Sequence, residues 1–162
     1  MNFQKLKYKG RKKMKKCLLA VLICLLTVSF AFAQEKGTAK EAQDLVAKAI
    51  AYYKAESKDK AFAAISDPKG PFTKKDLYVF VYDFDVVCLA HGANKALVGK
   101  NFSELKDSTG KQFAKEIVDG GKSKGKGWVD YKWTNPTTKK IDSKSSYYQK
   151  EGDFIFACGI YK

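Results

Sequence analysis

Residues 76–101 read DLYVFVYDFDVVCLAHGANKALVGKN, and this stretch decides the expected fold. It contains two apolar runs, residues 77–82 and 86–90, joined by a turn that carries Asp83 and Asp85. Continuous apolar runs of this length are typical of strands that are covered on both faces. We therefore expect the first run at the centre of a sheet, with the second run beside it.

The C-terminal part of the chain predicts three more strands. The aromatic stretch GWVDYKW is followed by a second hairpin, made of residues 143–150 and 154–161 around the turn EGD. The last run is again continuously apolar and is expected at the sheet centre. This order predicts an antiparallel five-stranded sheet with helices packed on it, and hence an α+β fold.

Side chains alternate between the two faces of a strand, which sorts the residues of the third and fourth strands. Tyr131 and Trp133 share one face, whereas Trp128 lies on the other. In the next strand Tyr147 lies on one face and Lys144 on the opposite face. Amphipathic aromatic residues of this kind either wall a pocket or pack as core.

Helices are expected before the sheet and in its longest crossing segment. Thr38 and Glu41 form a capping box, and a helical stripe follows it, made of Ala42, Leu45, Val46, Ala49, Ile50 and Tyr53. Shorter helices are predicted at residues 60–65 and 111–118. Residues 120–127 hold four glycines among basic residues, which predicts a flexible hinge or lid.

The first 33 residues are interpreted as a secretion signal. A basic segment precedes an apolar run at residues 18–32, and Ala31-Phe32-Ala33 is a small-x-small cleavage site. Met14 is an alternative translation start. An uncleaved anchor is the rival interpretation, but the run is shorter than the ~20 residues of a membrane-spanning helix. We expect residues 1–33 to be removed and residues 34–162 to form one domain outside the cytoplasm, periplasmic or secreted.

Charge argues against a nucleic-acid partner. The formal net charge of +14 falls to +6 in residues 34–162, which carry 23 basic and 17 acidic side chains. The single arginine, Arg11, lies in the predicted signal. Arginine dominates specific recognition of phosphates and bases, so we expect no nucleic-acid binding.

No motif indicates catalysis, a metal or a cofactor. The chain has no G-x-S-x-G, H-E-x-x-H or C-x-x-C-H sequence, and His91 is its only histidine. A lone histidine does not assemble a zinc site. We therefore expect a protein that is not an enzyme.

Five segments, LYVFVYDFD, LAHGANKALVGKN, LKDSTGKQF, GWVDYKWTNP and KSSYYQ…GIYK, resemble in order the single Cache domain of the second type. The resemblance covers residues 34–162. It implies a PAS-like antiparallel sheet with strand order 2-1-5-4-3, a long N-terminal helix and a helical crossing segment. The turn at residues 83–86 departs from the family by lacking a glycine, which affects the expected turn geometry alone.

The resemblance also implies a function. Such domains bind small molecules outside the cytoplasm, often a short organic acid, and usually belong to chemoreceptors or sensor histidine kinases. This chain ends directly after its last strand, so we expect a free-standing secreted version that binds a small metabolite and presents it to a membrane receptor or sensor kinase. We further expect any homodimer to form through the N-terminal helix.

The implied strand order separates the two cysteines of the domain. Cys88 and Cys158 would lie on strands two apart, about 10 Å from one another, whereas a disulfide needs Cα atoms within about 7 Å. Two buried free thiols are therefore favoured over a disulfide.

The candidate ligand-binding residues are polar or aromatic side chains on neighbouring strands of the implied sheet: Tyr82, His91, Tyr131, Trp133, Lys144 and Tyr147. Lys144 and Lys100 are the candidate anion anchors. If His91 lines the pocket, binding is expected to depend on pH near the titration range of imidazole. The alternative function is a structural or partner-binding protein, in which Tyr131, Trp133 and Tyr147 pack closely without a cavity.

Overall fold

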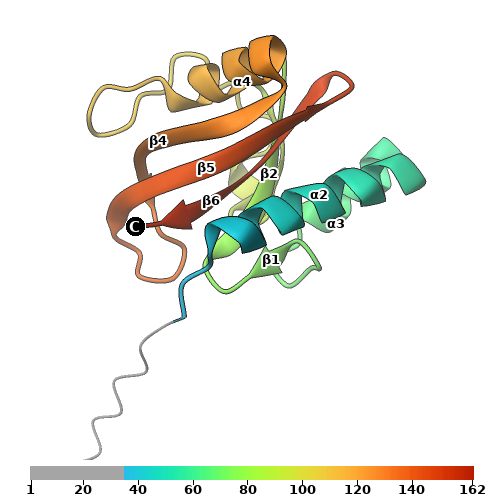
Figure 1. Cartoon of the computed structure of the whole chain (residues 1–162), viewed down its shortest axis with the longest axis horizontal. Helices are drawn as coiled ribbons and strands as arrows, with labels where there is room; N and C mark the ends of the chain where they lie inside the picture. Colours follow the sequence, from blue (N-terminus) through green and yellow to red (C-terminus); the bar gives the residue numbers. More distant parts are fainter. Residues whose placement is uncertain (1–34) are drawn as a thin grey trace, which may run out of the picture. The chain divides into compact units, whose positions relative to one another are not determined.

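A computed structural model describes residues 35–162, in which helices pack against an antiparallel sheet (Figure 1). The predicted signal peptide lies outside the described residues. The elements of the described residues follow the predicted order: helices first, then a hairpin, a crossing segment and three long strands. The predicted fold class is confirmed.

Within residues 35–162, the sheet is antiparallel and has six strands. They are β1 (Thr73–Lys74), β2 (Leu77–Asp83), β3 (Cys88–His91), β4 (Lys126–Thr134), β5 (Ile141–Glu151) and β6 (Phe154–Tyr161). Their order is β1-β2-β6-β5-β4. β3 also pairs with β2, on the edge that β1 uses and farther along the strand. Apart from the two-residue β1, this is the order that the resemblance implied, with the two most apolar strands, β2 and β6, at the centre.

Two helices cover one face of the sheet (Figure 1). They are α2 (Ala39–Ala55) and α3 (Lys58–Ile65). The apolar stripe of α2 packs on side chains that alternate along the central strands, among them Val79, Val81 and Phe156. Burial of this stripe, rather than helix propensity, is what holds such a helix in place.

The helix α4 (Phe113–Lys124) and a crossing segment with the 3₁₀ turn η1 (Lys95–Leu97) cover the other face. The core on this side is rich in tyrosine and phenylalanine, including Tyr78, Phe80 and Tyr82 of β2. The candidate site lies on this face.

The structure corrects the prediction for residues 111–127. The helix continues to Lys124, so most of the predicted hinge or lid is helical. Gly120 and Gly121 lie where the helix meets Tyr148 and Ile155, and a Cβ at either glycine would clash with those side chains. The helix ends at Gly125, whose φ of 79° favours glycine. The glycines thus permit close packing and a helix end instead of flexibility.

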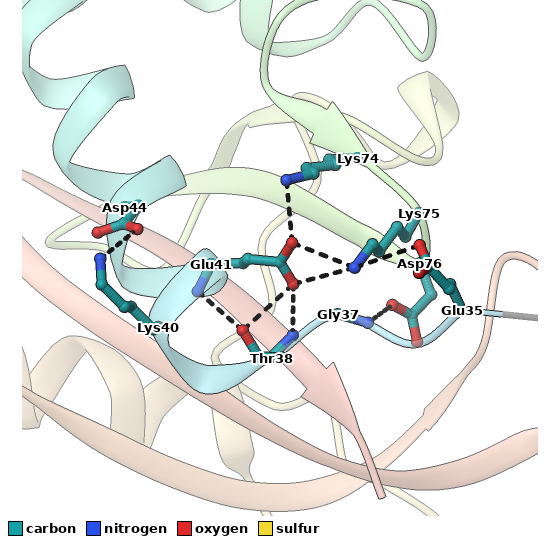
Figure 2. Close-up of polar contacts among 9 residues, drawn as sticks. All are labelled: Glu35, Gly37, Thr38, Lys40, Glu41, Asp44, Lys74, Lys75 and Asp76. Carbon is teal, nitrogen blue, oxygen red and sulfur yellow. Dashed lines mark hydrogen bonds and ion pairs between the residues drawn. The ribbon is translucent and has the colours of Figure 1, made fainter.

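Hydrogen bonds and ion pairs connect the start of α2 to β1 and to the turn between β1 and β2 (Figure 2). Glu41 accepts hydrogen bonds from the backbone N–H of Thr38, which confirms the capping box, and pairs with Lys74 at 2.9 Å and Lys75 at 3.2 Å. Hydrogen bonds from Lys74 and then from Thr38 lower the pKa of Glu41 to about 2. Asp76 accepts a hydrogen bond of 2.7 Å from the backbone N–H of Gly37.

Cys88 and Cys158 are buried and free. They belong to β3 and β6, with β2 between them, and pack into the cores on opposite faces of the sheet. The topological argument against a disulfide agrees with this placement.

Candidate functional site

Lys144 is the most unusual buried residue of the domain. It lies on β5 with 1% of its surface exposed, and its side chain crosses β6 toward β2. Gly159 makes this crossing possible, because a Cβ there would collide with Lys144 Cε and Ser146 Oγ. Lys144 Nζ donates a hydrogen bond of 2.7 Å to Tyr78 Oη.

Aromatic rings surround the amine. Nζ lies 3.9 Å from the centroid of the Tyr78 ring, 4.9 Å from Tyr161 and 5.4 Å from Phe80. Ring faces attract a cation, but they do not neutralise it. Among residues 35–162, no carboxylate lies within ion-pair distance of Lys144, and burial lowers the pKa of its amine from 10.5 to about 7.

The hydroxyls beyond Lys144 form a directed chain. Tyr161 Oη donates to the backbone oxygen of Thr134 at 2.9 Å, so its single hydrogen is used there. The contact of 3.2 Å between the hydroxyls of Tyr78 and Tyr161 then has Tyr78 as the donor. The chain therefore runs from Lys144 through Tyr78 and Tyr161 to Thr134.

His91 ends β3 and is 3% exposed. Its Nδ1 accepts hydrogen bonds from the backbone N–H groups of Ala93, at 3.3 Å, and Asn94, at 3.0 Å. The neutral ring therefore carries its hydrogen on Nε2. Burial, reinforced by the nearby charge of Lys144, lowers the pKa of His91 to about 3, which keeps the ring neutral.

A cavity of about 280 Å³ opens beside these residues. It lies between the end of β3, the start of η1 and the β4–β5 turn, and is lined by Tyr78, His91, Ala93, Asn94, Leu97, Trp133, Thr134, Pro136 and Lys139. None of the lining residues is acidic, whereas the imidazole N–H of His91, the indole N–H of Trp133 and the ammonium group of Lys139 are available as donors. Such a set suits an anionic or carbonyl oxygen.

A larger hollow of about 470 Å³ lies between α4 and β4. It is a shallow groove whose lining mixes lysines with acids such as Glu116 and Asp119. None of its lining residues is a buried charge. A third hollow, of about 270 Å³, is lined by the buried Lys144 but also by the acids Asp107 and Asp130. We therefore place the candidate site at the cavity of about 280 Å³, which has no acidic lining residue and meets Lys144 through Tyr78.

The structure separates the residues that the sequence grouped together. His91 and Trp133 line the cavity, and Lys144 lies behind Tyr78. Tyr147 is on the opposite face, where its ring packs 5.5 Å from Trp128 and its hydroxyl donates to Gln149. The predicted cluster of Tyr131, Trp133 and Tyr147 is therefore wrong.

Two other predicted residues pack as core on the correct face. Tyr131 stacks on Phe113 with ring centroids 4.2 Å apart, and its hydroxyl lies 2.8 Å from Ser146 Oγ. Tyr82 packs edge-on against Phe102. Neither lines the cavity. Lys100 is exposed and also lies outside it.

Sequence reasoning missed Tyr78, Tyr161 and Gly159. The two tyrosines stand inside continuous apolar runs, where they read as core. Gly159 was the available signal, because a glycine within a strand often marks the close approach of another group.

Residues 35–162 hold neither a metal-ligand cluster nor a membrane-spanning helix. These residues contain no cluster of three or more histidine, cysteine or acidic side chains suited to a metal ion. No helix in this part of the chain combines the length and apolar character needed to cross a bilayer.

Comparisons with known proteins agree with the fold. The sequence model of the family described as Single Cache domain 2 matches residues 6–161. Over 89 residues the chain is 36% identical to the sensor histidine kinase MctS of Rhizobium johnstonii, a match that covers 54% of this chain and 19% of the kinase. The chain therefore spans about a fifth of that relative.

Solved structures show the same architecture. A methyl-accepting chemotaxis protein from Vibrio parahaemolyticus superposes with a TM-score of 0.66 at 23% identity, over 75% of this chain and 86% of that one. A Cache chemosensory domain, studied for its recognition of carboxylic acids, superposes with a TM-score of 0.65 at 26% identity, over 75% and 91%. With the family match spanning nearly its whole length, this chain belongs to the single Cache domain 2 family.

Proposed function

We propose that this protein is an extracytoplasmic sensory domain that binds a small monocarboxylate in the cavity lined by Tyr78, His91 and Trp133. The observation that carries the proposal is a donor-rich cavity without acidic lining residues, backed by the buried Lys144. Cache domains of chemoreceptors and sensor kinases are extracytoplasmic, and a structural relative recognises carboxylic acids.

The cavity supports a ligand of few heavy atoms. Its volume of about 280 Å³ lies at the lower end of the range of about 300–1,000 Å³ that is typical of small-molecule pockets. The apolar wall of Ala93, Leu97 and Pro136 suits a short alkyl group, while the donors suit one carboxylate. Without arginine in residues 34–162, a second carboxylate would lack a bidentate partner.

The lining residues support a binding role rather than acid–base catalysis. His91 is held neutral, and no lining residue is an acid that could pair with it. We propose that the bound state is passed on by contact with a membrane receptor or sensor kinase. A homodimer through the exposed side of α2 remains a prediction.

A calorimetric panel tests the proposal. Residues 34–162 are unfolded and refolded to remove carried-over ligand, and then titrated at pH 6.0 with acetate, propionate, lactate, succinate and neutral propionamide. We expect heat with one or more monocarboxylates and loss of binding in Tyr78→Phe and His91→Leu. No heat with any compound would refute the proposal and favour a partner-binding protein instead.

A further inference from the structure

Lys144 lacks the partner that a buried ammonium group requires. A charged amine has three N–H donors, but its hydrogen bond to Tyr78 uses one of them. Buried charges are otherwise paired, because a bare ion in a low-dielectric interior is strongly disfavoured. The carboxylate of Asp76 is attractive at longer range, but its hydrogen bond is with the Gly37 backbone N–H. Burial without a counterion therefore shifts the equilibrium of this amine toward its neutral form.

Titratable groups lie near Lys144 on every neighbouring element: Tyr78 on β2, His91 on β3, Tyr131 on β4, Tyr161 on β6 and Asp76 in the β1–β2 turn. Cys158 of β6 packs on the opposite face of the sheet but is close enough to interact electrostatically with the amine. Burial raises the pKa of the three tyrosines above their ordinary range. It raises the pKa of Cys158 to about 12 and lowers that of His91 to about 3. Between about pH 7 and pH 9 the tyrosines, the thiol and His91 therefore all stay neutral. Lys144 is the member of this set of bases, thiol and phenols whose charge changes in that range.

Resting on the proposed carboxylate function, we infer that Lys144 takes up a proton when an anionic ligand enters the cavity. Lys144 lies behind Tyr78, which accepts from Nζ, donates to Tyr161 and lines the cavity, so the amine senses the charge of the ligand across the Tyr78 side chain. The negative charge of the ligand acts as the counterion that Lys144 lacks among the side chains around it. The domain therefore captures a carboxylate together with a proton, and responds to both concentrations.

The size of the coupling follows from Coulomb's law. If a separation of about 6 Å between the anion and Nζ is taken, with an effective dielectric constant of about 20, the anion favours the charged amine by roughly a hundredfold. With a pKa of about 7 in the empty site, binding should weaken about tenfold between pH 6 and pH 8. At pH 8 the protein should take up roughly 0.8 proton for each ligand that binds. A free carboxylic acid is already ionised throughout this range, so it does not contribute.

Calorimetry in matched buffers measures the proton directly. Propionate is titrated at pH 8.0 in phosphate and in Tris, whose ionisation heats differ, and the difference in observed heat gives the number of protons taken up. The dissociation constant is measured at pH 6.0, 7.0, 8.0 and 9.0. We expect an uptake of roughly 0.8 proton at pH 8.0 and the tenfold loss of affinity described above.

Three variants assign the effect. Lys144→Met should bind propionate weakly, with no proton uptake and a flat pH profile. Lys126→Met, which removes an exposed lysine on β4, should keep the wild-type uptake. His91→Gln should bind less tightly but keep the pH slope, which separates Lys144 from the histidine.

The outcomes separate the coupling from the function beneath it. Binding with equal affinity at pH 6.0 and 8.0 and with buffer-independent heat would overturn the coupling and leave the carboxylate function intact. No binding at pH 6.0, where Lys144 is mostly charged, would overturn both. If Lys144→Met does not fold, the two-buffer measurement on the wild-type protein still decides the question.

Discussion

Replacing Lys144 with methionine is expected to make the unliganded domain more stable at pH 7. The pKa of Lys144 falls from 10.5 to about 7 on folding, because the amine becomes buried without a counterion. Near pH 7 that shift corresponds to a cost of about 4 kcal/mol. Methionine fills a similar volume and has no charge to desolvate.

Part of this gain is offset. The substitution removes the hydrogen bond from Nζ to Tyr78 Oη, which contributes about 1 kcal/mol, while Tyr78 still donates to Tyr161. The net stabilisation at pH 7 is therefore about 3 kcal/mol. For a domain of this size it should raise the melting temperature by roughly 10 °C.

The stability difference between Lys144→Met and wild type should depend on pH. Between the folded and unfolded pKa of Lys144, the unfolded chain binds a proton that the folded protein does not, so wild-type stability rises with pH in that window. The advantage of Lys144→Met should therefore shrink by about 2 kcal/mol from pH 7 to pH 9 and be greatest below pH 7.

Urea denaturation at pH 6, 7, 8 and 9, followed by circular dichroism, measures this difference. Lys126→Met is the matched control and should differ little from wild type at every pH. A Lys144→Met variant that is less stable than wild type at pH 7, or whose difference does not change with pH, would refute the reasoning that the amine is buried without a partner.

Three further predictions concern neighbouring contacts. Tyr78→Phe removes the acceptor of Lys144 and should cost about 1–3 kcal/mol in urea denaturation while weakening carboxylate binding in calorimetry. Gly159→Ala should displace Lys144, because the added methyl group occupies the path of its side chain; destabilisation of about 1–3 kcal/mol and weaker binding are expected, and an unchanged affinity would contradict that path. Glu41→Gln should remove stability that wild type has above pH 4.5 and loses as the pH falls toward about 2, so the two unfolding curves should converge in acid.

The sequence predicted the fold where its physical signals are local. Two continuous apolar runs located the central strands, because a strand covered on both faces has no polar side to show. Thr38 and Glu41 located the start of the long helix, since both capping contacts lie within one turn. The strand order came from the resemblance and not from these signals.

The sequence failed where the outcome depends on contacts across the sheet. The glycines of residues 120–127 suggested flexibility, yet two of them permit α4 to approach Tyr148 and Ile155. Alternation already put Lys144 and Tyr147 on opposite faces of one strand, so both could not belong to one site. The register between β4 and β5 decides which of the two shares a face with Tyr131. In the structure Tyr131 is paired with Lys144, so Tyr147 points to the other face.

The candidate site illustrates how burial reorders the titratable groups of a protein. His91 is the residue whose ordinary pKa predicts a response near neutral pH, but two backbone N–H groups hold its Nδ1 and burial keeps the ring uncharged. Lys144 is ordinarily charged at every physiological pH, but the same low-polarity environment brings its pKa to about 7. Desolvation acts on both bases in the same direction, which moves one out of the useful range and the other into it. A pH response of this domain is therefore expected to depend on the lysine, and His91→Gln and Lys144→Met should separate the two residues in one experiment.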